Sequence, residues 1–100
     1  MGAQGTATVD FGAFPGATDA SVAVTGQAGI GAGSLVEAWI VPAATADHSA
    51  DEHLVEAIRV RAGSIVPGTG FAIYALKDGD TLGGDQNRLY GQWSLAWVWN

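Results

Sequence analysis

The chain has 100 residues, of which 48% are hydrophobic and only 14% charged, and it contains no cysteine. This length predicts one domain, and the apolar fraction excludes an intrinsically disordered chain. The net charge of −6, with only four basic residues, argues against nucleic acid and anionic membranes as partners, because Lys and Arg must neutralise phosphates there. The lack of cysteine excludes disulfides and thiolate chemistry.

Targeting signals are also missing from the sequence pattern. No apolar run reaches the roughly 18 residues that a membrane-spanning helix needs. The N-terminus has no basic region followed by an apolar block, which is the pattern of a signal peptide. We therefore expect a protein made in the cytoplasm, without a transmembrane segment.

The first third of the chain predicts two strands. Residues 6–11 and 19–25 alternate between apolar and polar side chains, the period of a half-buried strand. A Pro-Gly pair at 15–16 predicts the turn between them. Residues 26–33 hold four glycines and predict a loop, in which Ile30 is expected to fill the end of the core.

Residues 34–41 predict a third strand with apolar side chains on both faces. Glu37 falls between Leu35 and Trp39 on one face, and Val36, Ala38 and Ile40 share the other. A strand of this kind lies either in the centre of a sheet or under a partner chain.

Residues 51–61 fit two patterns. Ser49 and Glu52 match a capping box, and Leu54 and Ile58 are spaced i, i+4, which favours a helix. The same two apolar residues also share the parity of a strand, and the segment lies among strands. We expect a strand here, with at most a short helical turn near Ser49.

The last third begins with a predicted strand over residues 71–76. Residues 77–87 are the most polar segment and predict a loop. Within it, the Asp-Gly-Asp sequence at 78–80 resembles the opening of a calcium loop, but no distal Glu follows, so a turn is expected.

Residues 89–100 predict the strand that supplies most of the core. Trp93, Trp97 and Trp99 share one parity with Leu95, and the opposite parity carries smaller or more polar side chains. A buried aromatic side chain removes about 150–250 Å² from water. We therefore expect the isolated domain not to fold without its last four residues.

Together these patterns predict an all-β protein. We expect one antiparallel β-sandwich over residues 1–100, jelly-roll-like, with six to eight strands and no helix longer than two turns. The aromatic residues expected in the core or at an interface are Trp39, Phe71, Tyr74, Trp93, Trp97 and Trp99.

Residues 47–53 gather two histidines and three acidic residues within seven positions. His48, Asp51 and His53 are the candidate metal ligands, because imidazole and carboxylate groups bind divalent metals. The spacing matches no zinc motif, and neighbouring Asp, His and Ser residues rarely adopt the geometry of a catalytic triad. We expect a solvated acidic loop, with no metal, cofactor or catalysis.

The chain resembles small structural proteins of tailed bacteriophages. The segments that carry the resemblance cover most of the chain: VDFGAFPG at 9–16, SLVEAWI at 34–40, TADHSADEH at 45–53, GTGFAIYA at 68–75 and AWVWN at 96–100. Residues 77–87 differ from that group. The resemblance implies a virion component near the capsid or tail and transfers no catalytic residue.

We therefore expect a non-enzymatic virion structural protein, either a capsid decoration or a tail- or fibre-associated component. Scarce charge and a strand that is apolar on both faces predict self-association, as a homotrimer or another small ring, and attachment to other virion proteins. The alternative is a carbohydrate-binding module for receptor recognition, in which the tryptophans form a platform for sugar rings.

Overall fold

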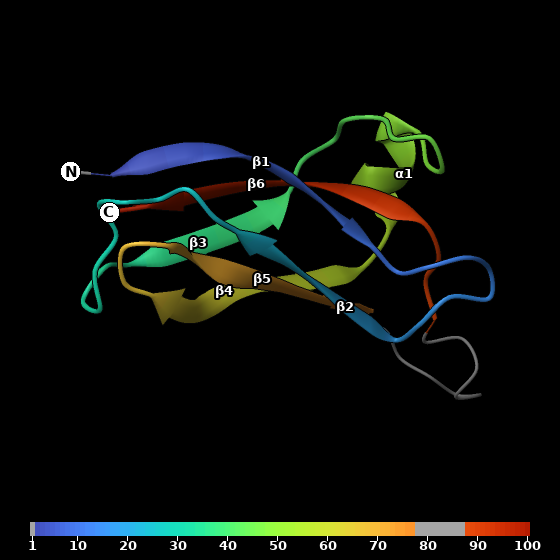
Figure 1. Cartoon of the computed structure of the whole chain (residues 1–100). Helices are drawn as coiled ribbons and strands as arrows, with labels where there is room; N and C mark the ends of the chain where they lie inside the picture. The colour runs from blue at the N-terminus through green and yellow to red at the C-terminus, as the bar shows by residue number, and fades with distance from the viewer. Residues whose placement is uncertain (1, 78–87) are drawn as a thin grey trace.

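The computed structural model describes residues 2–77 and 88–100, and in these ranges the chain forms two antiparallel sheets of three strands each (Figure 1). The first sheet has the order β1-β6-β3 and the second β2-β5-β4. The elements are β1 (Ala3–Asp10), β2 (Asp19–Val24), β3 (Val36–Ile40), α1 (Ala50–Val55), β4 (Ile58–Val66), β5 (Gly70–Lys77) and β6 (Gln92–Trp99). The prediction of a mainly β protein is confirmed. The predicted loop over 77–87, with its turn at 78–80, lies beyond Lys77 outside the described residues.

Strand β6 is the centre of the first sheet, with β1 on one side and β3 on the other. Trp97 lies opposite Gly5 of β1 and Ala38 of β3. The glycine is needed there, because a Cβ at Gly5 would lie 2.6 Å from the Trp97 ring. Small residues on both neighbouring strands thus leave room for the large indole between the sheets.

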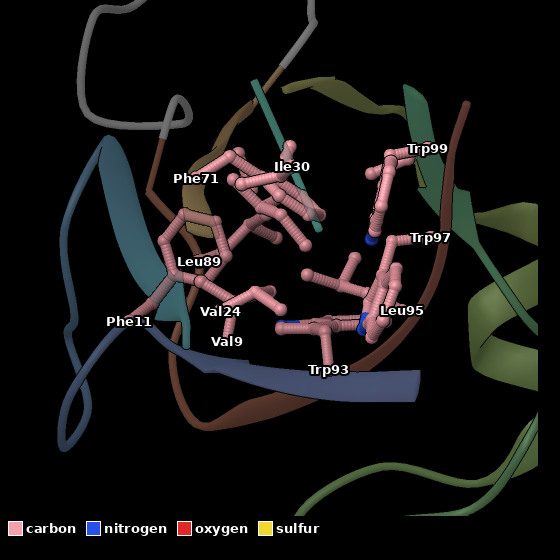
Figure 2. Close-up of a cluster of buried hydrophobic side chains, with 13 residues drawn as sticks. Val9, Phe11, Val24, Ile30, Phe71, Leu89, Trp93, Leu95, Trp97 and Trp99 are labelled. Carbon is pink, nitrogen blue, oxygen red and sulfur yellow. The ribbon is translucent and has the colours of Figure 1, made fainter. Parts of the chain in front are cut away.

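The inward side chains of both sheets meet in one core (Figure 2). Trp93, Leu95, Trp97 and Trp99 of β6 are all buried, at alternate positions along the strand. They pack with buried residues of the other strands and connections, which are Val9, Phe11, Val24, Ile30, Ala38, Phe71, Ile73, Ala75 and Leu89. Ile30 fills the core from the glycine-rich loop, as the sequence predicted.

Strand β3 differs from one expectation, since it lies at the edge of its sheet and not in the centre. Its even residues point into the core, while Leu35, Glu37 and Trp39 are exposed on the outward side. Tyr74 of β5 is likewise outward and exposed. Trp39 and Tyr74 therefore do not belong to the core, and of the two roles expected for them only the interface role remains.

The expectation of a strand across residues 51–57 is wrong. Helix α1 occupies Ala50–Val55, and the strand begins only at Ile58. Both halves of the Ser49–Glu52 capping box are formed, and Asp51 adds a second acid to the first turn, where the helix dipole favours negative charge. Leu54 points to solvent and does not share the inward face of Ile58.

Candidate functional site

Side chains from the β3–α1 connection and from α1 replace the missing part of β3 along the first residues of β6. Thr45 Oγ1 donates to the Gln92 carbonyl at 2.8 Å, and Asp47 Oδ2 accepts from the Gln92 N–H at 2.8 Å. His53 Nε2 accepts from the Ser94 N–H at 2.9 Å. Backbone groups that would otherwise lack a strand partner are therefore satisfied by side chains.

The close approach of Asp47 depends on Gly91. This residue has φ +75°, and a Cβ on it would lie 2.6 Å from the Asp47 Cβ. Glycine adopts this backbone conformation without steric cost and leaves space for the aspartate. The connection after β3 is thereby fixed against the start of β6.

His53 has a structural role. Its side chain is only 4% exposed, and its Nδ1 donates to the Ser49 carbonyl at 2.8 Å while Nε2 accepts from Ser94. The ring edge also contacts Trp93, with centroids 4.8 Å apart. Because both ring nitrogens already have partners, His53 could bind a metal ion only by giving up one of these hydrogen bonds.

His48 is buried against the same tryptophan. Its ring stacks on Trp93 with centroids 3.8 Å apart and an interplanar angle of 21°. Nε2 lies 2.6 Å from the Tyr90 carbonyl and Nδ1 lies 3.1 Å from Glu52 Oε2. The Tyr90 carbonyl and the Glu52 carboxylate thus give each ring nitrogen of His48 a hydrogen-bond partner, and the ring is held against Trp93.

Glu52 connects the histidine to the helix. Its Oε1 accepts from the Ser49 N–H at 2.7 Å, and its Oε2 faces His48. The hydrogen bond from the Ser49 backbone lowers the pKa of Glu52 below its ordinary value, and the His48 side chain lowers this pKa further. The carboxylate is half-exposed, and it both caps the helix and orients the buried imidazole of His48.

The three candidate metal ligands do not converge. His48 and His53 use their ring nitrogens in the hydrogen bonds given above, and Asp51 is exposed on the first turn of α1. Across residues 2–77 and 88–100, no three His, Cys, Asp or Glu side chains lie close enough to hold a metal ion.

A pocket of about 280 Å³ opens beside His48. Its lining includes Phe14 and Pro15 of the β1–β2 connection, together with Tyr90. The Phe14 and Tyr90 rings meet edge to face, with centroids 5.6 Å apart. The pocket lies with α1 and the β1–β2 connection at the end of the molecule opposite the termini (Figure 1).

Polar groups line the rest of this pocket. Glu52 and Glu56 contribute carboxylates from the helix, and Arg88 contributes a guanidinium group. Phe14, Glu56 and Tyr90 cannot be recognised from sequence as members of one site, because residues so far apart in the chain carry no local signal that they meet. The unusual composition of residues 47–53 was the only indication of this region.

Exposed aromatic and aliphatic side chains also lie on the outward surfaces of the two sheets. On the first sheet, Trp39 is 45% exposed and Leu35 76% exposed. On the second sheet, Tyr74 is 43% exposed and lies opposite Arg61 of β4. Large apolar side chains therefore face outward on both sheets, on opposite sides of the core.

Of the four tryptophans that could form a sugar platform, three lie in the core, because Trp93, Trp97 and Trp99 are buried. Trp39 is outward, and a hollow beside it is lined also by Gln4, Thr6, Ala96 and the edge of the buried Trp97.

Comparison with protein-family models, curated proteins and solved structures gives no match. In the part of the chain that the structure describes, no helix has the length and apolar character needed to cross a membrane.

Proposed function

We propose that this chain is a non-enzymatic structural component of a tailed-phage virion that acts by self-association and attaches to a larger particle. The observation that carries the proposal is the outward apolar surface on both sheets, with Trp39 and Leu35 on one and Tyr74 on the other. A copy of the same chain, arranged as a homotrimer or another small ring, would cover such a surface by symmetric closure.

The composition of these surfaces supports an interface. Tyr, Trp and Arg are enriched where proteins associate. Tyr74 has Arg61 directly opposite on β4, and Leu76 has Arg59 opposite, so two of the four basic residues of the chain flank this apolar row. The net charge of −6 keeps the unassembled protein soluble and directs it away from the genome.

The proposal includes a finer fold, a jelly-roll-like β-sandwich. In its support, the pairings β1–β6 and β2–β5 are nested, with β3 and β4 between them in the chain. Strands β1 to β4 alternate between the two sheets and the β4–β5 hairpin lies within the second sheet, an order that a long rolled hairpin gives. Jelly rolls are frequent in viral capsid and lectin domains, so the fold supports the virion proposal by analogy alone.

Surface variants test the self-association. Replacing Trp39 or Tyr74 with Ser should shift the wild-type assembly towards the monomer in sedimentation velocity. Val55→Ser is the matched control, because Val55 is 83% exposed but lies on α1 and not on a sheet. Equal sedimentation of all four proteins would contradict an assembly through the sheet faces.

The virion role needs a separate test. Peptide mass spectrometry of gradient-purified particles, made by the phage that encodes the chain, should recover this protein in a fixed ratio to the capsid protein. Recovery only in the lysate supernatant would exclude a structural component of the particle.

A further inference from the structure

The pocket between the β1–β2 connection, α1 and residues 88–93 combines aromatic rings with polar groups. Phe14 is 79% exposed in the β1–β2 connection, so most of its ring surface is accessible to a ligand. The ring of Tyr90 stands at 82° to it. Two rings at this angle form an apolar corner against which the C–H face of a small ring can pack.

The charges around this corner are already balanced. The two carboxylates of Glu52 and Glu56 are matched by two cations, Arg88 in the pocket lining and Lys77, which is paired with Glu56. Arg88 Nη1 donates to the Gly16 carbonyl at 3.2 Å, which uses one of the five N–H groups of a guanidinium. The pocket therefore does not select a strongly charged ligand.

Hydrogen-bonding capacity nevertheless remains. Each carboxylate oxygen has two lone pairs, and the carboxylates of Glu52 and Glu56 line the pocket together with the Arg88 guanidinium. A ligand that both donates and accepts hydrogen bonds, and that carries no net charge, would use these groups without disturbing the existing pairs. Hydroxyl groups on a saturated ring have this chemistry.

The volume limits the ligand further. About 280 Å³ lies at the lower end of the range for small-molecule sites, which is roughly 300–1,000 Å³. This space accommodates one six-membered ring with its hydroxyl groups.

We propose that this pocket binds a single neutral sugar residue, stacked on Phe14 and Tyr90 and hydrogen-bonded to Glu52, Glu56 and Arg88. The site lies apart from Trp39 and Tyr74, so the inference does not depend on self-association. Trp93 also lines the pocket but is only 2% exposed, so Phe14 and Tyr90 supply the accessible rings. The sugar is either a free monosaccharide or the terminal residue of a glycan.

Saturation-transfer NMR of the full chain with glucose, galactose, mannose and N-acetylglucosamine tests the proposal. We expect transfer from aromatic protons to at least one of these sugars, and binding about ten-fold weaker in Phe14→Ala, whose exposed ring can be removed without affecting the core. Val55→Ala is the matched control, since it shortens an exposed apolar side chain outside both the pocket and the proposed interface, and it should bind as the wild type does.

Other results would overturn the proposal. These are transfer to none of the four sugars, wild-type affinity in Phe14→Ala, or loss of binding in Val55→Ala. Tighter binding of glucuronate than of glucose would contradict a neutral ligand. A disaccharide ending in the bound sugar separates the two sources. If it binds as tightly as the monosaccharide, the site accepts the terminal residue of a glycan; if it does not bind, the site takes only the free monosaccharide. Light scattering of Phe14→Ala should give the wild-type mass, so that self-association is judged separately.

Discussion

His53 shows how one side chain can replace a strand partner. Its Nε2 accepts from the Ser94 N–H, and without this acceptor a buried backbone donor would have no partner. We expect His53→Leu to lower the free energy of unfolding by about 1–3 kcal/mol in urea denaturation, because leucine fills a similar space but has no hydrogen-bond acceptor. Asp51→Ala on the exposed side of the same helix is the control, with an expected loss below about 1 kcal/mol. Equal losses for the two variants would show that the Ser94 hydrogen bond adds nothing.

Glu52 makes part of the stability depend on pH. Its pKa in the folded state is lowered, chiefly by the Ser49 backbone N–H and then by His48, relative to an ordinary value of 4.5. The stabilisation is therefore complete above pH 4.5 and is lost as the pH falls through the folded-state pKa. We expect the urea midpoint of the wild type to fall more steeply between about pH 5 and pH 3 than that of Glu52→Gln, which keeps a capping-box residue. Parallel pH profiles of the two proteins would contradict this role.

At the scale of elements, β6 is the strand on which the first sheet depends. Trp97 and Trp39 belong to adjacent pairs in the β3–β6 register, yet one is buried and the other outward. We expect Trp97→Ala to cost about 3–5 kcal/mol and Trp39→Ala less than about 1 kcal/mol, measured by urea denaturation at a protein concentration where the chain is monomeric. Deletion of residues 97–100 should abolish cooperative unfolding. A truncated chain that still melts cooperatively would show that β6 is not essential to the core.

The sequence predicted β6 well and α1 poorly for a physical reason. Period-two alternation persists over the whole length of β6, and each large odd residue is buried. In α1 the apolar residues Leu54 and Val55 are exposed, so the strand-like parity of the apolar residues was misleading there. The capping box, a local hydrogen-bonding signal, identified the helix correctly. In so short an element, capping outweighs apolar periodicity.

At the scale of the whole molecule, the division into sheets could not be read from the chain. Strands β3 and β6 are far apart in sequence yet adjacent in the first sheet, and this pairing places β3 at the edge. The pocket could not be read from the chain either, because Phe14, Glu52 and Tyr90 meet only through the long-range pairing of strands. Local patterns predict which residues face inward, but not which surfaces meet.

The central claim is that the outward apolar surfaces are covered by further copies of the chain. Light scattering after size-exclusion chromatography, at low micromolar concentration, tests it most directly. We expect a mass of three times 10.2 kDa, or another small multiple that a closed ring allows. A single species of 10.2 kDa at every concentration measured would contradict the self-association that we propose.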